Sequence, residues 1–205
     1  SGADAGRLDF ALNLFCGLIL YNVFSSCVGK APDLVVGNRN YVKRVVFPLE
    51  VLPVAVLGSS LVDAAMSLAI LIPALLIFSP KISSTLYLFP LVFIPLCAMT
   101  LGLSWFLASM GVFLRDIGQF VQVMLRLLFF LSPIFYPVSA VPEGLQKILY
   151  LNPLTSILED GRRILIRDQS PDWIMWISVT VVSLIILQLG YVWFMKSKRA
   201  FADVV

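Results

Sequence analysis

Apolar stretches separated by short polar or charged segments are the main pattern of this chain. Five of them are close to or longer than the roughly 20 residues that a helix needs to cross a ~30 Å hydrocarbon core. They cover residues 10–28, 49–78, 86–114, 117–137 and 174–195. The pattern therefore predicts an all-α integral membrane protein, in which residues 1–205 form a single transmembrane domain with five transmembrane helices.

The segments between these stretches differ in composition. Residues 1–9 are small, polar and slightly acidic, which is typical of an aqueous loop. Residues 29–47 place several Lys and Arg side chains beside a long apolar stretch, a pattern typical of a cytoplasmic membrane edge and of a surface for a soluble partner. Prolines, glycines and charges interrupt residues 138–173, which predicts re-entrant external half-helices at 143–150 and 154–166, dipping into the outer leaflet and back.

The basic residues predict the orientation in the membrane. If residues 29–47, Arg115 and the C-terminus share one side, that side holds eight Lys and Arg residues and the other side holds six. The basic clusters beside the span ends make the first side cytoplasmic, with the N-terminus outside and the C-terminus inside. Because the chain starts at Ser1 without Met or a signal sequence, we expect an upstream membrane helix, which gives six in the full-length protein.

Composition narrows the class of protein further. Hydrophobic residues make up 60% of the chain and charged residues 13%, whereas soluble domains have about 25% charged residues. The net charge is only +3 and the basic residues flank the spans, so we expect no nucleic-acid partner. Histidine is absent and the three cysteines lack Cys-x-x-Cys spacing, which argues against a metal site, a disulfide and a membrane enzyme such as a glycosyltransferase or intramembrane protease.

Five sequence segments resemble the permease subunits of type-2 ABC exporters, in the branch that exports O-antigen, capsule and teichoic-acid chains. They are NYVKRVVFPLEVLP at residues 40–53, GVFLRDI at 111–117, LSPIFYP at 131–137, LNPLT at 151–155 and RAFAD at 199–203. The resemblance covers nearly the whole chain in the same order. It implies a fold of six membrane helices after an interfacial helix, of which the interfacial helix and the first membrane helix precede residue 1.

The resemblance implies that the chain is the membrane subunit of an ATP-driven exporter that moves a lipid-linked polysaccharide across a bacterial inner membrane. An exporter of a drug, haem or another lipid is the alternative with the same topology. The chain has no G-x-x-x-x-G-K-[ST] phosphate-binding motif, so we expect no catalytic residues or cofactors in it and ATP with Mg²⁺ on two copies of a separate ATPase subunit. We also expect a homodimer of this chain, because one subunit rarely encloses a pore wide enough for a glycan.

The resemblance also assigns residues 29–47 as the cytoplasmic coupling segment that docks into the ATPase. Without it, the same charges are ordinary positive flanks held near anionic headgroups. The Arg-Asp turn at 115–116 is either a solvated turn or a second contact to the ATPase. The expected ATPase-coupling residues are Arg39, Tyr41, Val42, Lys43, Arg44, Arg115 and Asp116.

Two charges lie inside spans, and each should face protein or water because a charge in mid-bilayer is costly. Asp63 and Arg126 either form a structural pair, with Arg126 alternatively bonded to backbone carbonyls, or Arg126 attracts a pyrophosphate-linked lipid head beside a pore. Phe135 and Tyr136 either pack against lipid or form a non-specific wall along which a sugar polymer slides.

The first stretch has a wetter face, which adds weaker candidates for the substrate path. The complete expected path is Tyr21, Asn22, Arg126, Phe135 and Tyr136. The charged second half of residues 138–173 is expected to form an external gate latched between protomers. Its members are Glu159, Asp160, Arg162 and Arg163.

Overall fold

The computed structural model describes residues 2–38, 48–78, 85–114, 116–136, 138 and 141–204. Every regular element within these ranges is helical, so the predicted all-α fold is confirmed. In chain order the elements are α1 (Gly2–Lys30), α2 (Asp33–Val36), α4 (Val51–Phe78), the 3₁₀ turn η1 (Leu86–Leu88), α5 (Phe89–Phe113), α6 (Ile117–Leu131), α7 (Glu143–Leu149), α8 (Pro153–Leu165) and α9 (Trp173–Val204).

Four of the helices are long and apolar enough to cross a membrane. These spans are Phe10–Lys30, Val51–Ile77, Leu86–Phe113 and Trp173–Phe201. The prediction for residues 117–137 is partly wrong, because α6 has only 15 residues and a length of about 22 Å. It ends where Ser132 turns to an extended backbone (φ −82°, ψ 143°), the conformation that Pro133 imposes on the residue before it.

The prediction of an aqueous loop over residues 1–9 is also wrong. Helix α1 begins at Gly2 and continues without a break to Lys30. No proline lies within residues 2–30, so no residue in this range lacks the backbone N–H that the helix needs. Two short helices are confirmed as α7 and α8, each within one residue of the expected bounds, and their external, re-entrant placement stays a prediction.

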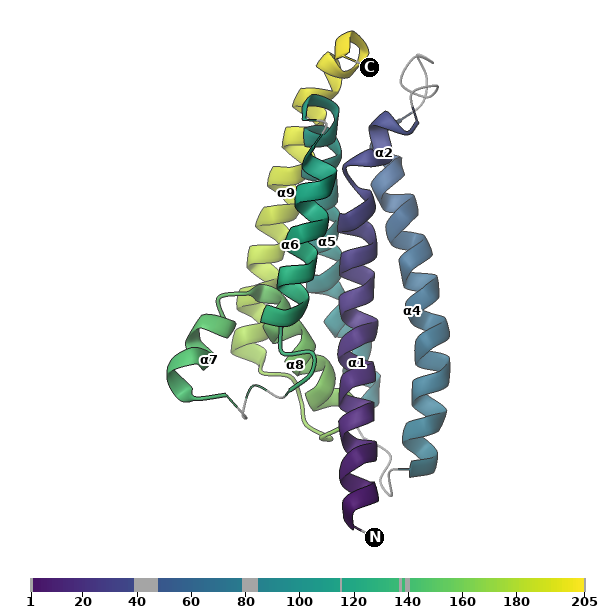
Figure 1. Cartoon of the computed structure of the whole chain (residues 1–205), viewed down its shortest axis with the longest axis vertical. Coiled ribbons are helices and arrows are strands. Elements are labelled where there is room, and N and C mark those ends of the chain that lie inside the picture. Colours follow the sequence, from purple (N-terminus) through teal and green to yellow (C-terminus); the bar gives the residue numbers. More distant parts are fainter. Residues whose placement is uncertain are drawn as a thin grey trace.

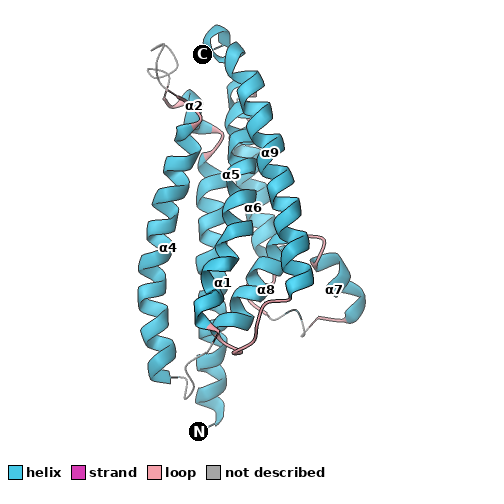
Figure 2. Ribbon diagram, turned by 180° about the vertical axis from the view of Figure 1, so that it is seen from behind, coloured by secondary structure: helices cyan, strands magenta, loops and turns pink. Residues whose placement is uncertain are grey.

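The long helices run along the longest axis of the molecule (Figure 1). The N-terminus, the end of α4 and the helices α7 and α8 lie towards one end, and α2, the start of α6 and the C-terminus lie towards the other. This arrangement agrees with the predicted grouping, in which the segment after α1, the turn before α6 and the C-terminus share one side. Seen from behind, α9 lies along α5 (Figure 2).

Two glycines allow α5 and α9 to approach each other at backbone distance. A Cβ atom added at Gly190 would overlap the backbone of Gly102, and one added at Gly102 would overlap the backbone of Ile186 and Leu187. Small residues give such close packing in membranes, where no hydrophobic effect drives helices together. Gly102 and Gly190 therefore set the distance between α5 and α9, the two helices with the most extensive contact.

We predict that Gly190→Ala destabilises the protein by about 1–3 kcal/mol, because the added methyl group overpacks the α5–α9 contact. Thermal unfolding of the purified protein in detergent measures the loss. Gly58→Ala is the matched control: it lies in helix α4 with open space around it, so the same change should cost nothing and can add up to about 1 kcal/mol. Equal stability of the two variants would contradict the close α5–α9 contact.

Candidate functional site

Helix α1 is central to the fold, and it leaves one strip of its surface uncovered between α4 and α6. Within the membrane span this strip carries Asn22, which is exposed, and Ser25 and Ser26, which are half-buried. The predicted polar residues therefore lie where α1 lacks helix neighbours among the described residues. The prediction of a separate apolar face is wrong in part, because Phe15 is also exposed and lies two turns before Asn22 on the same strip. A lipid-facing surface would be apolar here, so the strip is suited to contact with water, protein or a polar substrate.

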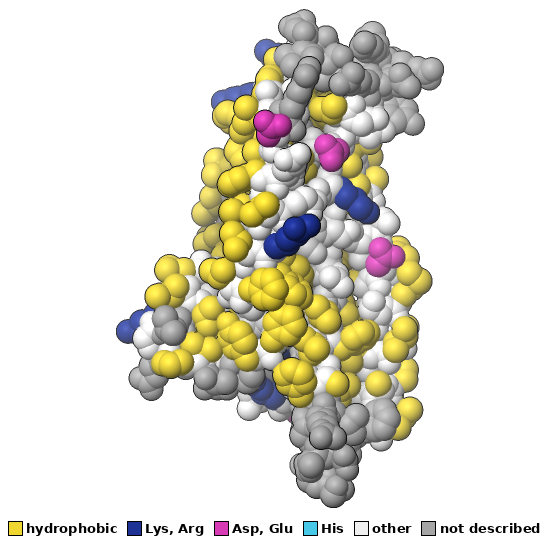
Figure 3. All heavy atoms as spheres, viewed as in Figure 1, with side chains coloured by type: hydrophobic (Ala, Val, Ile, Leu, Met, Phe, Trp, Pro, Cys, Tyr) yellow, Lys and Arg dark blue, Asp and Glu magenta, His cyan; other side chains and the backbone are white. Residues whose placement is uncertain are grey.

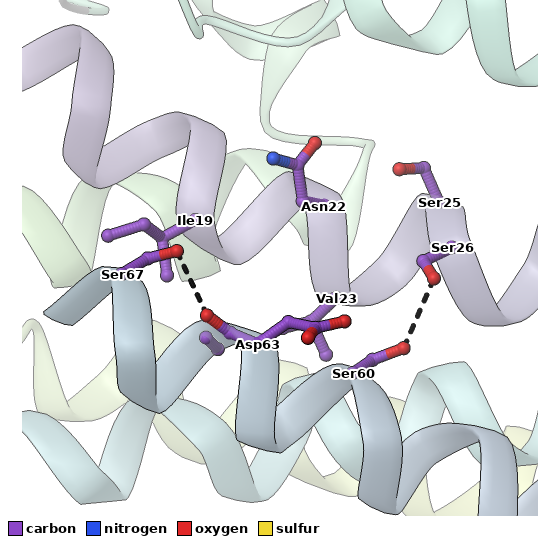
Figure 4. Close-up of a pocket in the computed structure, with 9 residues that line it drawn as sticks. Ile19, Asn22, Val23, Ser25, Ser26, Ser60, Asp63 and Ser67 are labelled. Atoms are coloured by element: carbon purple, nitrogen blue, oxygen red, sulfur yellow. Dashed lines mark hydrogen bonds between the residues drawn. The ribbon is translucent and has the colours of Figure 1, made fainter.

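A hollow of about 280 Å³ lies beside this strip, between α1 and α4 (Figure 4). The Cys27 thiol donates to the Ser60 hydroxyl at 3.3 Å, and the Ser60 hydroxyl donates to Ser26 Oγ at 3.2 Å, which joins the two helices. On the other side of the hollow, Ser67 Oγ donates to the Asp63 backbone oxygen at 2.9 Å. The complete lining is Ile19, Asn22, Val23, Ser25, Ser26, Ser60, Asp63, Ala64 and Ser67.

Asp63 is the charged member of this hollow. Its side chain is exposed and lies between α4 and α1, with Ser60 and Ser26 on one side and Ser67 on the other (Figure 4). No described residue gives its carboxylate a hydrogen bond or an ion pair. The predicted pairing of Asp63 with Arg126 is therefore not found within the part of the chain that the structure describes.

Helix α6 borders the strip on the opposite side. Arg126 is exposed, and no backbone carbonyl of the described residues accepts a hydrogen bond from it. One turn earlier, Gln122 Nε2 donates to the Gly29 backbone oxygen at 3.1 Å, which ties α6 to α1. On this face of the molecule, charged side chains lie over one half of α1, α4 and α6, and hydrophobic side chains gather over the other half (Figure 3).

Aromatic rings form the apolar part near the end of α6. Phe129 packs edge-on against Phe135 with ring centres 5.1 Å apart, and Phe130 stacks on Phe135 at 6.4 Å. Phe135 is exposed and Tyr136 is half-buried, as a wall along a path requires. Tyr21 differs: it is 5% exposed, packs on Phe129 and donates its hydroxyl to the Leu125 backbone oxygen, so its side chain joins α1 to α6 instead of facing the strip.

Arg162 of α8 is enclosed within the subunit. Its guanidinium is 1% exposed and donates to the backbone oxygens of Asn13 at 3.3 Å, Ile134 at 2.6 Å and Tyr136 at 3.2 Å. Gly17 leaves room for it, since a Cβ there would lie 3.0 Å from Arg162 Nη2. The expected role of Arg162 as a latch between protomers is corrected, because its donors are used to tie α8 to α1 and to the segment after α6.

The acids of α8 are also occupied inside the subunit. Glu159 is 8% exposed and accepts a hydrogen bond from Arg167 Nη1 at 2.6 Å. Asp160 is 4% exposed and accepts from the Asp172 backbone N–H at 3.1 Å, which connects α8 to the start of α9. Arg163 is half-buried. The interactions of Glu159 and Asp160 hold the connection from α8 to α9, and a gate role for these residues remains a prediction.

Burial raises the pKa of the Asp160 carboxyl from 3.8 to about 6, although the hydrogen bond from the Asp172 N–H acts in the opposite direction. The effects of the neighbouring charges on this pKa partly cancel, because Arg163 lowers the pKa of the Asp160 carboxyl while Asp172 and Glu159 raise it. Asp160 is therefore a titratable group of the turn in mildly acidic conditions.

Most of the expected coupling residues lie outside the described residues. They are Arg39, Tyr41, Val42, Lys43, Arg44 and Arg115. Asp116 is described and exposed just before α6. At the same end, the Lys198 ammonium pairs with Glu50 at 2.6 Å, an ion pair between α9 and the residue before α4 that sequence reasoning missed.

Comparison with known proteins decides the family. The ABC-2 type transporter family model matches residues 2–166. The chain belongs to the ABC-2 type transporter family.

Three relatives of this ABC-2 chain are each named O-antigen export system permease protein RfbA. The protein from Myxococcus xanthus is 27% identical over 197 residues, which is 95% of this chain and 76% of that protein. Two proteins from Klebsiella pneumoniae are 26% and 25% identical over 96% of this chain and 76% of each protein. The resemblance noted from the sequence is therefore confirmed, and the chain is a multi-pass membrane protein of this family.

The serines around Asp63 are the site feature of this ABC-2 chain that sequence reasoning missed. Ser60, Asp63 and Ser67 follow each other at spacings of three and four, which places them on one face of α4. That spacing was visible in the sequence. What it could not show is that Ser25 and Ser26 of α1 lie against the same face.

We predict that the stability of the protein falls as pH rises from about 4 to 6, with a contribution from Asp160 of at most about 1.4 kcal/mol per pH unit. The folded state holds this proton more tightly than the unfolded state, so its stabilisation is complete below pH 4 and is lost as pH rises through 6. Thermal unfolding in detergent at several pH values measures the slope. Asp160→Asn keeps the acceptor oxygen and should flatten the slope, whereas Asp172→Asn should reduce it only slightly, because burial is the main cause of the raised pKa of Asp160. A parent protein with no slope in this range would contradict the shifted carboxyl.

Proposed function

We propose that this chain is the transmembrane subunit of an ATP-driven exporter that moves a lipid-linked polysaccharide across the bacterial inner membrane. The observation that carries the proposal is the uncovered face of α1, α4 and α6. Its polar residues include Asn22, Asp63 and Arg126, which are exposed, and its aromatic residues include Phe135, which is exposed, and Tyr136, which is half-buried. On this face, charged and hydrophobic side chains gather over different halves (Figure 3). Membership of the ABC-2 type transporter family supports a role in transport. The names of the three relatives favour a polysaccharide substrate over a drug, haem or another lipid.

Such a face has the chemistry that a moving glycan needs. A sugar presents hydroxyl groups at its edges and apolar C–H surfaces on its faces. Amide, carboxylate and guanidinium groups bind the hydroxyls, while aromatic rings pack against the C–H surfaces without fixing one position. Binding along such a path must be weak enough for the polymer to leave each place, as in any conducting pore.

Two copies of the chain would enclose the path, with this face directed to its interior. The driving force would come from two copies of a separate ATPase subunit that bind ATP and Mg²⁺. Closure of the ATPase dimer would move the coupling segment at residues 29–47, and the rigid helices α1 and α4 on either side would carry the movement into the membrane. The C-terminus and the start of α6 lie at the same end as this segment, which we propose is the cytoplasmic end.

We predict that Lys43→Glu weakens the complex with the ATPase subunit at least about tenfold, equivalent to about 1.4 kcal/mol, because it reverses a charge at the docking surface. Tyr41→Ala should lower the stimulation of ATP hydrolysis by removing an apolar anchor. Co-purification of the full-length proteins and ATPase assays measure both effects. Lys147→Glu is the control, since this residue lies in α7 at the other end of the molecule. Normal assembly and coupling in both coupling variants would overturn the docking role.

We predict that Arg126→Ala lowers the amount of polysaccharide reaching the cell surface several-fold while the protein level stays normal. The exposed guanidinium would attract the pyrophosphate-linked head of the substrate, and alanine removes that attraction. Quantitative detection of surface glycan measures the effect. Arg126→Lys should restore part of the export because it keeps the charge. Unchanged surface glycan in Arg126→Ala would exclude an essential substrate contact at this position.

A further inference from the structure

The carboxylate of Asp63 lies deep in the membrane span. It stands 12 residues after Val51 and 15 before Phe78 along α4, and therefore about 18 Å and 22 Å from the two helix ends. A carboxylate at this depth that faced lipid would cost roughly 2.5–3.5 kcal/mol on insertion scales. Since no described residue bonds to it, this carboxylate requires a polar environment from outside the described chain.

The residue next to Asp63 shows that only one face of α4 needs a polar environment. Val62 is 59% exposed and lies about 100° around the helix from Asp63, where an apolar side chain suits contact with lipid. On the Asp63 side, the next polar groups are the hydroxyls of Ser60 and Ser67 and the strip of α1. The polar hollow is thus bounded by a lipid-compatible surface, as the edge of a path through the membrane would be.

The groups in the hollow offer a mixed set of donors and acceptors. Asp63 contributes an ionised oxygen pair that only accepts, and Asn22 contributes an amide that both donates and accepts. The Ser25 hydroxyl projects from α1 near Asn22 (Figure 4). Two adjacent hydroxyls of a sugar ring can donate to the two oxygens of one carboxylate. Hydroxyls at the other edge of the ring can bond to the amide and the serine, whose side chains point away from α4 (Figure 4).

Size and charge restrict the ligand further. A volume of about 280 Å³ is at the lower end of ligand pockets, which run from about 300 to 1,000 Å³, so the hollow suits one sugar ring and excludes a lipid anchor. A carboxylate repels phosphate and carboxylate substituents. An anionic head would instead bind at Arg126, across the strip on α6.

We propose that the hollow formed by Asp63, Asn22 and Ser25 is a saccharide subsite that holds adjacent hydroxyls of one uncharged sugar residue of the passing polymer. This inference rests on the proposed export function and adds a place on the path to it. The subsite binds weakly and repeatedly, because its hydrogen bonds replace those that the sugar makes with water.

Cysteine accessibility tests the subsite in the full-length protein together with its ATPase in cells. Asp63→Cys and Val62→Cys are treated with the membrane-impermeant thiol reagent 2-sulfonatoethyl methanethiosulfonate. They are made in a Cys97→Ser background, because Cys97 is only half-buried whereas Cys16 and Cys27 are buried, and that background protein gives the baseline. Asp63→Cys should react at least about tenfold faster than Val62→Cys, because thiolate and reagent both need water. Asn22→Cys provides a second reporter on α1.

Labelling is then compared between cells that make the polysaccharide and cells in which its synthesis is blocked. The subsite predicts at least threefold slower labelling of Ser67→Cys, which lines the hollow and keeps the Asp63 carboxylate, when polymer is present, and no change at Val62→Cys. Failure of Asp63→Cys to react faster than Val62→Cys would mean that a protein surface covers the hollow and would overturn the proposal. Fast labelling that polymer does not slow would mean a water-filled hollow without a sugar, with the same consequence.

The amount of surface glycan separates this inference from the export function. Asp63→Asn keeps one acceptor oxygen and should lower export about threefold to tenfold while protein level and ATPase stimulation stay normal. Normal export by Asp63→Asn, with no protection of Ser67→Cys, would refute the subsite and leave the exporter intact. Absence of any glycan export by the unsubstituted protein with its ATPase would instead refute the exporter.

Discussion

The buried guanidinium of Arg162 donates hydrogen bonds to backbone carbonyls that lipid could not satisfy. After Leu131 the chain leaves the helical conformation while still close to the aromatic wall, and the carbonyls of Ile134 and Tyr136 lose their helical partners. Unpaired carbonyls at this depth are tolerated only where protein donors reach them. Arg162 supplies those donors and also bonds to Asn13, so the end of α6, the helix α8 and the first half of α1 are held as one unit.

The rest of the candidate path depends on that unit. Because the segment after α6 is held against α1, Phe135 is placed beside Phe129 and Phe130, and Tyr136 lines a hollow of about 230 Å³ with Arg162. Tyr21 reinforces the same contact through its hydroxyl bond to Leu125. The rings that could contact a substrate are therefore positioned by groups that do not contact it. Buried arginines and tyrosines near a path need not belong to its surface.

Sequence reasoning predicted the helices well where apolar length was the deciding quantity. It failed at the two places where local chemistry overrides length: Pro133 ends α6 early, and the proline-free residues 2–9 extend α1. For the site, it found Asn22, Arg126 and Asp63 because polar groups in apolar spans are conspicuous. It assigned Tyr21 and Arg162 to exposed roles because a sequence carries no information on which neighbour covers a side chain.

The amino-acid sequence by itself determined the all-helical membrane class, the approximate spans and the positions of the two short helices α7 and α8, because each follows from hydrophobic length and from proline and glycine along the chain. Only the tertiary structure decided which polar groups are bonded within the subunit and which are left uncovered. Arg162 and Asp63 are both charges within an apolar protein, yet one is surrounded by carbonyls and the other lies uncovered in a hollow. That difference arises from the packing of distant helices, which determines how many donors and acceptors reach each charge.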